Sequence, residues 1–192
     1  RNFGFFPAFS LGWRISNESF MENTKEWLNN LKLRASYGQV GNDVYTVGGV
    51  AQRFLYEEKW SQISNDYMFG TSGKSGIYET QYPNYGVTWE RAHKYNVGLE
   101  FGLWNGLLNG NIDLFHEKRN DILTNYLTRP EWVGVTMAAG NLGETVNSGF
   151  EIELKHNNHI GKEFQYNVGL TFSHAKNEIK NMDEPALKTD YR

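Results

Sequence analysis

Two pairs of residues in the last third of the sequence have types and spacings that active sites use. Glu151 and Glu153 are two residues apart, so in a strand both carboxylates share one face, as in a general acid-base pair. His156 and His159 are three residues apart in a segment, 156–161, that reads as a turn. No nucleophile or base accompanies the carboxylates, and a metal site needs more ligands in converging geometry. The pattern therefore indicates neither an enzyme nor a metal or cofactor site.

A larger set of charged residues recurs at alternate positions of strand-like segments. If these segments form a barrel wall, such positions face a water-filled interior, where they hold an inner domain or line a solute path. A polar lumen also tolerates such charges without any role, and this simpler interpretation is favoured. The set is Arg14, Lys32, Arg34, Lys94, Glu100, Asp113, Glu117, Glu151, Glu153 and Lys155.

Aromatic residues accumulate in two long segments where periodicity fades. Their rings are suited to stacking on sugar rings or to contacting a partner protein. Tyr and Trp also form membrane girdles and pack loops together, and for any single residue that reading is favoured. As a group they are the best candidates for contact with a substrate or partner. They are Trp60, Tyr67, Tyr78, Tyr82, Tyr85 and Trp132.

One long hairpin, residues 92–119, would position several of these charges. Apolar and polar residues alternate strictly in both halves, which indicates two strands. The dipeptide Asn105-Gly106 favours a type I′ turn, which fixes the register. That register sets Leu99 opposite Ile112 on an apolar face, and on a polar face it sets Gly98 opposite Asp113, Glu100 opposite Asn111 and Lys94 opposite Glu117.

The length of these strands indicates a membrane wall. They approach the ~9–11 residues that a tilted strand needs to cross a bilayer, whereas strands of soluble sandwiches are usually shorter. Similar alternation occurs at 3–14, 31–41, 146–156 and 166–173. Connections at 105–106 and 156–161 are short, and those at 42–86 and 120–145 are long, as expected for periplasmic turns and extracellular loops. Residues 70–76, GTSGKSG, read as a flexible stretch.

These features predict an all-β fold, namely an antiparallel transmembrane β-barrel segment with long extracellular loops. The smallest barrels have ~8 strands, so about six strands are part of a larger barrel. The composition agrees: mean hydropathy is -0.62, no apolar run is long enough for a membrane helix, and aromatic residues make up 15%. The chain has no cysteine, and its net charge of -3 gives no reason to expect nucleic-acid binding.

With these motifs in view, the sequence resembles the SusC/RagA family of TonB-linked outer-membrane proteins. The matching segments cover most of the chain outside the loops, and they are residues 6–20, 31–43, 82–115, 118–123 and 141–154. The resemblance implies a barrel of roughly 22 strands, an N-terminal plug, energy coupling through TonB, and uptake of glycans or peptides with a SusD-like surface lipoprotein. Gly98, Gly102, Gly149 and Gly169 would leave room for the plug on the inner face.

The resemblance also implies that residues 1–192 are a partial receptor barrel in the bacterial outer membrane. No signal peptide, plug or C-terminal strand is recognisable, so we expect both ends to be cut from something longer. Two alternatives stay open. One is a siderophore-type receptor without a lipoprotein partner, and the other is a structural or adhesive β-protein, such as a soluble sandwich whose apolar face is covered by a second sheet.

Overall fold

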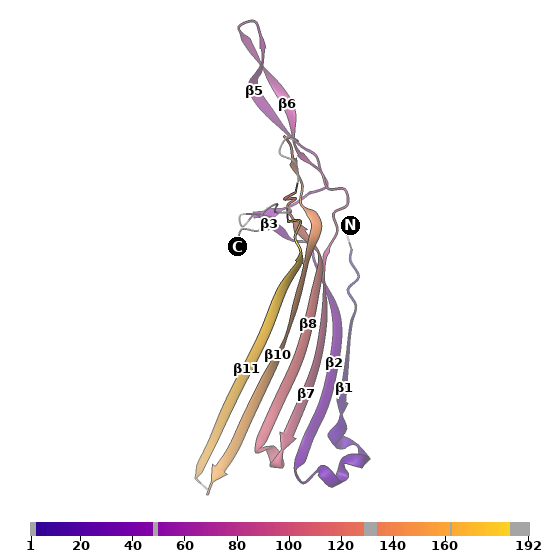
Figure 1. The fold of residues 1–192 in the computed structure, drawn as a ribbon, viewed down its shortest axis with the longest axis vertical. Coiled ribbons are helices and arrows are strands. Elements are labelled where there is room, and N and C mark those ends of the chain that lie inside the picture. The colour runs from indigo at the N-terminus through magenta and orange to yellow at the C-terminus, as the bar shows by residue number, and fades with distance from the viewer. Residues whose placement is uncertain (1–2, 48–49, 129–133, 162, 185–192) are drawn as a thin grey trace, which may run out of the picture.

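The computed structural model describes residues 3–47, 50–128, 134–161 and 163–184, without the side chains of residues 65–67 and 69. Its main body is one antiparallel sheet of six strands, and within this sheet the strands lie side by side in their order along the chain. Figure 1 shows this sheet as a tall, curved wall. The strands are β1 (Ala8–Arg14), β2 (Leu28–Asn42), β7 (Glu90–Leu103), β8 (Leu108–Thr124), β10 (Gly140–Ile160) and β11 (Phe164–Asn181).

The register of the β7–β8 hairpin confirms the predicted one. Leu99 pairs with Ile112, and Gly98 pairs with Asp113. The turn is closed by the Leu107 amide, which donates to the Trp104 carbonyl at 3.1 Å. Its central residues Asn105 and Gly106 have φ of 54° and 88°, the left-handed values that a type I′ turn requires.

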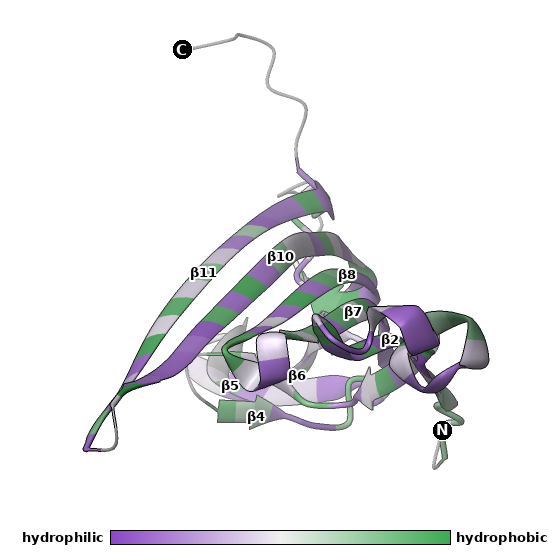
Figure 2. Ribbon diagram, turned by 90° about the horizontal axis from the view of Figure 1, so that it is seen from below, coloured by the Kyte–Doolittle hydropathy of each residue, from purple (hydrophilic) through white to green (hydrophobic). Residues whose placement is uncertain are grey.

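The register extends the two faces of the hairpin across all six strands. One outward row consists of Trp13, Leu33, Leu99, Ile112, Ile152 and Phe172. The neighbouring inward row consists of Gly12, Arg34, Gly98, Asp113, Glu151 and Ser173. Figure 2 shows the same alternation as purple and green bands along β10 and β11.

The apolar face lies open in the described part of the chain. Leu11 is 75% exposed and Phe172 is 60% exposed, although both belong to apolar rows. A soluble sandwich would bury such rows under a second sheet, whereas a barrel wall presents them to lipid. The predicted fold class, an antiparallel segment of a transmembrane β-barrel, is confirmed.

The connections alternate in length as predicted and define two ends of the wall. At the turn end lie residues 15–27, 104–107, 161 and 163, and the first of these segments contains the short helices η1 (Ile15–Asn17) and η2 (Ser19–Thr24). At the loop end lie the described residues of the connections 43–89 and 125–139. Several strands run further than predicted: β10 continues through the expected turn to Ile160, where Asn157 pairs with Asn167.

The long connection 43–89 has its own secondary structure. It contains β3 (Tyr45–Val47), β4 (Val50–Gln52), β5 (Lys59–Phe69) and β6 (Ser72–Tyr82), and β6 also pairs in parallel with β9 (Thr136–Met137). The expectation of a flexible stretch at 70–76 is wrong, because all but its first two residues lie in β6. Figure 1 shows the β5–β6 hairpin standing beyond the loop end of the wall.

No helix within the described ranges has the length and apolar character needed to cross a membrane.

Candidate functional site

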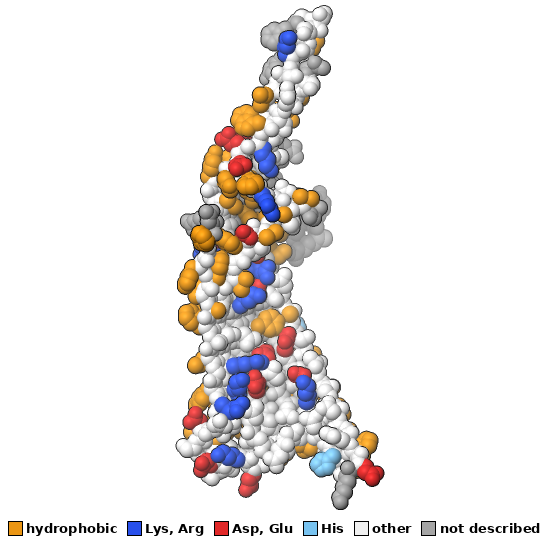
Figure 3. Space-filling model, turned by 180° about the vertical axis from the view of Figure 1, so that it is seen from behind, with side chains coloured by type: hydrophobic (Ala, Val, Ile, Leu, Met, Phe, Trp, Pro, Cys, Tyr) orange, Lys and Arg blue, Asp and Glu red, His pale blue; other side chains and the backbone are white. Residues whose placement is uncertain are grey.

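The inner face of the wall is the candidate functional site, because the charged residues predicted from alternation gather there. The strand register places all ten of them on this face (Figure 3). They are Arg14, Lys32, Arg34, Lys94, Glu100, Asp113, Glu117, Glu151, Glu153 and Lys155.

Arg34 links three strands at the centre of this face. Its Nη2 donates to both carboxylate oxygens of Asp113, at 2.7 and 2.9 Å, and to Asn111 Oδ1 at 3.1 Å. Its Nη1 lies 3.4 Å from Glu100 Oε1, and the Lys32 ammonium lies 3.6 Å from the same oxygen. Such hydrogen bonds between charged groups are about twice as strong as neutral ones. The cluster therefore joins β2, β7 and β8 on the polar side of the wall.

Gly98 makes the Arg34–Asp113 pair possible. It lies in β7, between the strands that carry the two partners, and the ion pair passes directly over it. A Cβ atom at this position would lie 2.3 Å from Arg34 Nε and 2.7 Å from Asp113 Oδ1. Any side chain at position 98 would thus displace the guanidinium.

The substitution Gly98→Ala is expected to lower the free energy of unfolding by about 1–3 kcal/mol, as overpacking usually does. Gly169→Ala is the matched control, since it also lies on the inner face and no atom lies within 4 Å of its added Cβ. The measurement is urea unfolding of the full-length protein in detergent micelles. Equal losses for both variants would contradict this role of Gly98.

Two of the other three glycines that were expected to leave room for a plug, Gly102 and Gly149, also have atoms close to the position of an added Cβ. A Cβ at Gly149 would lie 2.6 Å from the Phe115 ring and 2.1 Å from the His174 carbonyl oxygen, and one at Gly102 would lie 3.1 Å from Asn109 Oδ1. Side chains and backbone of neighbouring wall strands fill the space that was expected to admit a plug. Only Gly169 among these four has open space beside it.

A second ionic cluster lies nearer the loop end. Arg119 Nε donates to Glu117 at 2.7 Å, and Arg119 Nη1 lies 3.3 Å from Glu90. Lys94 pairs with Glu117 at 3.3 Å, and Asn42 donates to Glu90 at 3.2 Å. Sequence reasoning missed Arg119 and Glu90. The signal was present for Arg119, which follows Glu117 by two residues and must share its face.

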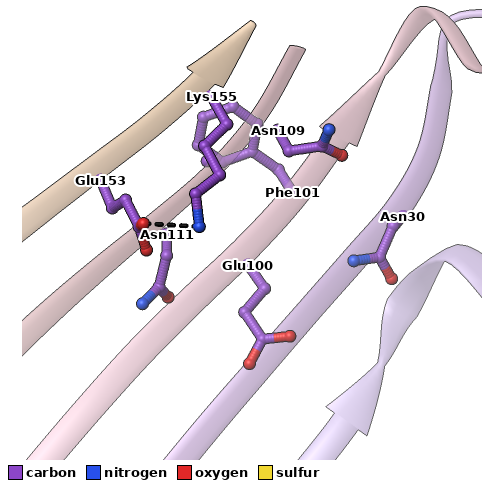
Figure 4. Close-up of a pocket in the computed structure, with 8 residues that line it drawn as sticks. Asn30, Glu100, Phe101, Asn109, Asn111, Glu153 and Lys155 are labelled. Carbon is purple, nitrogen blue, oxygen red and sulfur yellow. Dashed lines mark ion pairs between the residues drawn. The ribbon is translucent and has the colours of Figure 1, made fainter. Parts of the chain in front are cut away.

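A shallow hollow opens on the inner face near the turn end. Figure 4 shows its lining, in which Lys155 pairs with Glu153 at 2.6 Å. Amide and carboxylate side chains from four strands surround it, so it offers both donors and acceptors to a polar molecule or segment. Its other polar lining residues are Asn30, Glu100, Asn109 and Asn111.

The two long connections meet the wall at Asn141, the second residue of β10. The Asn141 side-chain amide donates to the carbonyls of Thr88 at 2.9 Å and Asp121 at 2.7 Å. Its carbonyl oxygen accepts from the Thr88 amide at 2.9 Å. Asn141 therefore joins the connection just before β7, the end of β8 and the start of β10.

Above Asn141, the two connections pack against each other. Leu55 from one and Ala138 and Ala139 from the other form a small buried cluster. Asn84 bridges it, because its backbone amide donates to the Leu55 carbonyl at 2.7 Å and its side chain donates to the Ala139 carbonyl at 2.8 Å. The loops at this edge are thus one packed unit.

The structure brings together two of the six candidate loop aromatics. Trp60 Nε1 and the Tyr85 hydroxyl both donate to the Glu58 carboxylate, at 3.4 and 3.2 Å. The bond to Glu58 raises the pKa of Tyr85. Both rings are largely exposed, at 57% and 77%. Sequence reasoning did not single out Glu58.

Of the other four aromatics, two lie apart from the Trp60–Tyr85 pair. The other two lie wholly or partly outside the part of the chain that the structure describes. Tyr78 pairs with Ser61 and Trp60 with Glu79, so their side chains lie on opposite faces of the hairpin. Tyr82 lies at the end of β6 and is 41% exposed. Tyr67 lies in β5, but its side chain is outside the described part, and Trp132 lies outside the described residues.

The two histidines that were considered for a metal site lie in β10. His156 belongs to an outward row and its ring lies against Tyr166, at 5.6 Å between centroids, whereas His159 lies three positions further along and faces the other side. Over the residues that the structure describes, no three acidic or histidine side chains converge as metal ligands.

Comparison with known proteins gives a family match over nearly the whole chain. Residues 1–191 match the family model described as TonB dependent receptor-like, beta-barrel. TonB-dependent receptor SusC of Bacteroides thetaiotaomicron is 30% identical over 185 residues, which are 93% of this chain. TonB-dependent receptor P39 of Formosa agariphila is 30% identical over 190 residues, 98% of this chain. The chain spans 17% of the length of each relative.

Solved structures with the same fold include two of the RagAB system. The RagAB peptide importer in its "open-open" state matches with a TM-score of 0.71 and 25% identity, over 91% of this chain and 18% of that chain. The structure of the RagAB peptide transporter matches with a TM-score of 0.69 and 24% identity, over 92% of this chain and 18% of that chain.

Proposed function

The chain belongs to the family of TonB dependent receptor-like β-barrels, and from this premise we propose that it forms part of the wall of an outer-membrane nutrient importer. The observation that carries the proposal is the two-faced sheet. Its outward rows are apolar and open, while its inward rows hold ion pairs among Arg34, Asp113 and Glu100. A wall between lipid and a water-filled interior needs both faces.

We further propose that residues 1–192 are one section of a longer barrel. The sheet has β1 and β11 at its two edges, and these strands do not pair with each other. Within a membrane, unpaired backbone groups at such edges cost several kcal/mol each, so further strands must cover them. The 17% share of the relatives' length supports this. The plug, the TonB-coupling segment and the remaining strands then belong to the rest of the protein.

The inner-face charges have a structural role in this proposal. Arg34, Lys94 and Arg119 are each bound to carboxylates of other wall strands. They stabilise the wall and leave the lumen polar. The hollow beside Glu153 and Lys155 is one part of this face that is open to a plug or a passing solute.

The exposed aromatics support uptake of glycans, with peptides as the second class. Trp60 and Tyr85 present their rings at the loop end, held by one carboxylate, Glu58. Rings with an apolar face and a polar edge suit sugars, which have apolar C–H faces and many hydroxyls. SusC is one relative and the RagAB peptide importer is a structural neighbour, and by analogy we propose a SusD-like surface lipoprotein as the partner that delivers the substrate.

The test is purification of the full-length, tagged protein from its native outer membrane in mild detergent. We expect a SusD-like lipoprotein to co-purify in stoichiometric amount. The complex is then screened against oligosaccharide and peptide panels, with Trp60→Ala compared with Met68→Ala, an exposed apolar residue near the hairpin tip. Loss of a ring is expected to weaken glycan binding by roughly twofold to tenfold. A barrel that purifies alone and binds chelated iron instead would identify a siderophore-type receptor.

A further inference from the structure

Two asparagines on the inner face have side chains without partners. Asn147 of β10 and Asn177 of β11 lie opposite each other in the register, and both face inward. Neither side-chain amide makes a hydrogen bond within the described part of the chain, whereas Asn111 on the same face donates to Asp113 at 2.7 Å. Asn147 and Asn177 are therefore free to bind a molecule in the interior of the barrel.

A second hollow of the inner face, the loop-end hollow, opens beside these amides, and its other lining residues include Thr145. Arg119 spans the two carboxylates of this hollow, because its Nε donates to Glu117 and its Nη1 lies 3.3 Å from Glu90. Lys94 also pairs with Glu117. Two cations thus balance two anions, and Arg119 Nη2 has no partner among the residues described. The loop-end hollow therefore offers unused donors and acceptors without net charge.

Phe115 interrupts the polar alternation of the inner face next to this hollow. At the inward positions of the six wall strands, over the residues that the structure describes, it is the only Phe, Tyr or Trp. Its inward row is adjacent to the row of Glu117, Asn147 and Asn177, and its ring lies over Gly149. Adjacent inward rows are about 7 Å apart. The partly exposed ring therefore flanks the hollow on the side of the turn end.

The loop-end hollow lies inside the wall rather than at its mouth. The two long connections meet the wall at Asn141, and Asn147 follows Asn141 by six residues in β10. Six residues of a strand extend about 20 Å. A solute that passes the exposed rings of Trp60 and Tyr85 at the loop end would then descend to this level.

We propose that the loop-end hollow and the Phe115 ring form a binding subsite for one neutral sugar unit of the imported glycan. A pyranose ring has an apolar C–H face that suits Phe115, and its hydroxyls both donate and accept hydrogen bonds, as the amides of Asn147 and Asn177 do. The balanced charge of the hollow gives no preference for the carboxylate or sulfate groups of acidic glycans. The subsite rests on the proposed function and deepens it, because it names a second contact inside the barrel and the sugar class that it takes.

The test is isothermal titration calorimetry on the full-length protein as purified from its outer membrane in detergent. The probes are neutral gluco-, manno- and galacto-oligosaccharides, with oligogalacturonates and peptides of similar length for comparison. We expect a neutral oligosaccharide to bind, and Asn147→Ala/Asn177→Ala to weaken this binding roughly tenfold through two lost hydrogen bonds. The matched control is Ser36→Ala/Asn96→Ala, which removes two paired polar residues of the inner face outside the hollow and should bind as the unchanged protein does.

A second variant separates stacking on the ring from packing of the wall. Phe115→Leu keeps an apolar side chain over Gly149 but removes the ring, so it should weaken the neutral oligosaccharide roughly threefold to tenfold. Urea unfolding of every variant accompanies the calorimetry. We expect Asn147→Ala/Asn177→Ala to unfold at the urea midpoint of the unchanged protein, because both side-chain amides lack partners in the described wall.

Three results would overturn the proposal. The first is equal affinity of Asn147→Ala/Asn177→Ala and its control for the neutral oligosaccharide, and the second is tighter binding of oligogalacturonates than of neutral probes. The third is a lowered urea midpoint for Asn147→Ala/Asn177→Ala, which would show that these amides hold the plug instead. All three leave the proposed import function intact if the unchanged protein binds a glycan and co-purifies with a lipoprotein. If the unchanged protein bound no glycan at all, the glycan class of the proposed function would fail, and this subsite with it.

Discussion

Replacing Asn141 with alanine is expected to lower the free energy of unfolding by about 2–4 kcal/mol and to open the loop end to proteases. Three hydrogen bonds disappear, and the Thr88 amide and the carbonyls of Thr88 and Asp121 lose their partners. A partly buried backbone group without a partner costs ~1–3 kcal/mol. The measurements are urea unfolding of the full-length protein and limited proteolysis of connections 43–89 and 125–139.

Two further variants separate hydrogen bonding from side-chain size. Asn147→Ala removes the same side chain from the same strand, where no side-chain hydrogen bond of Asn147 is found among the described residues, and we expect a change within about 0.5 kcal/mol. Asn141→Asp keeps the shape but sets a carboxylate oxygen against two carbonyl oxygens, so it should be at least as damaging as alanine. Stability restored by aspartate would show that donation by Asn141 is unimportant.

The central part of the wall was predictable because lipid and water impose opposite requirements on alternate residues. From Tyr95 to Leu103 each residue faces one solvent or the other, and the Asn105-Gly106 turn allows only one apolar pairing. The charged residues of the inner face followed from the same alternation, and the Lys94–Glu117 pair followed from the hairpin register. The Arg34–Asp113 pair did not, because it passes over Gly98, and only the register with both neighbouring strands reveals that position.

The strand ends were not predictable from alternation. Beyond the membrane both faces of a strand meet water. The sequence therefore shows no alternation of polar and apolar residues at Asn157, Asn158 and His159, although these residues pair with β11. The same holds for the β5–β6 hairpin, where glycines at 73 and 76 suggested flexibility. Asn141 acts through backbone partners in the connection before β7 and in β8, and a polar residue at a strand end gives no sign of such partners.

A charge placed in the middle of the outward face is expected to be as damaging as the loss of Asn141. Leu99 lies in β7 at the centre of the row from Trp13 to Phe172. Leu99→Lys should therefore cost about 2–4 kcal/mol of unfolding free energy, the value for lysine on the lipid face at the bilayer midplane. Asn96→Lys is the control, since Asn96 lies on the inner face of the same strand, where water solvates the ammonium.

A third variant distinguishes lipid from a protein core around Leu99. A packed core would resist a larger side chain, at a cost of typically 1–3 kcal/mol, because its neighbours cannot move aside. Acyl chains are fluid, so Leu99→Phe should leave the urea midpoint in lipid vesicles within error of the unchanged protein. If phenylalanine and lysine were both costly, the apolar face would be the interior of a sandwich. A cost for lysine alone is what a wall against lipid requires.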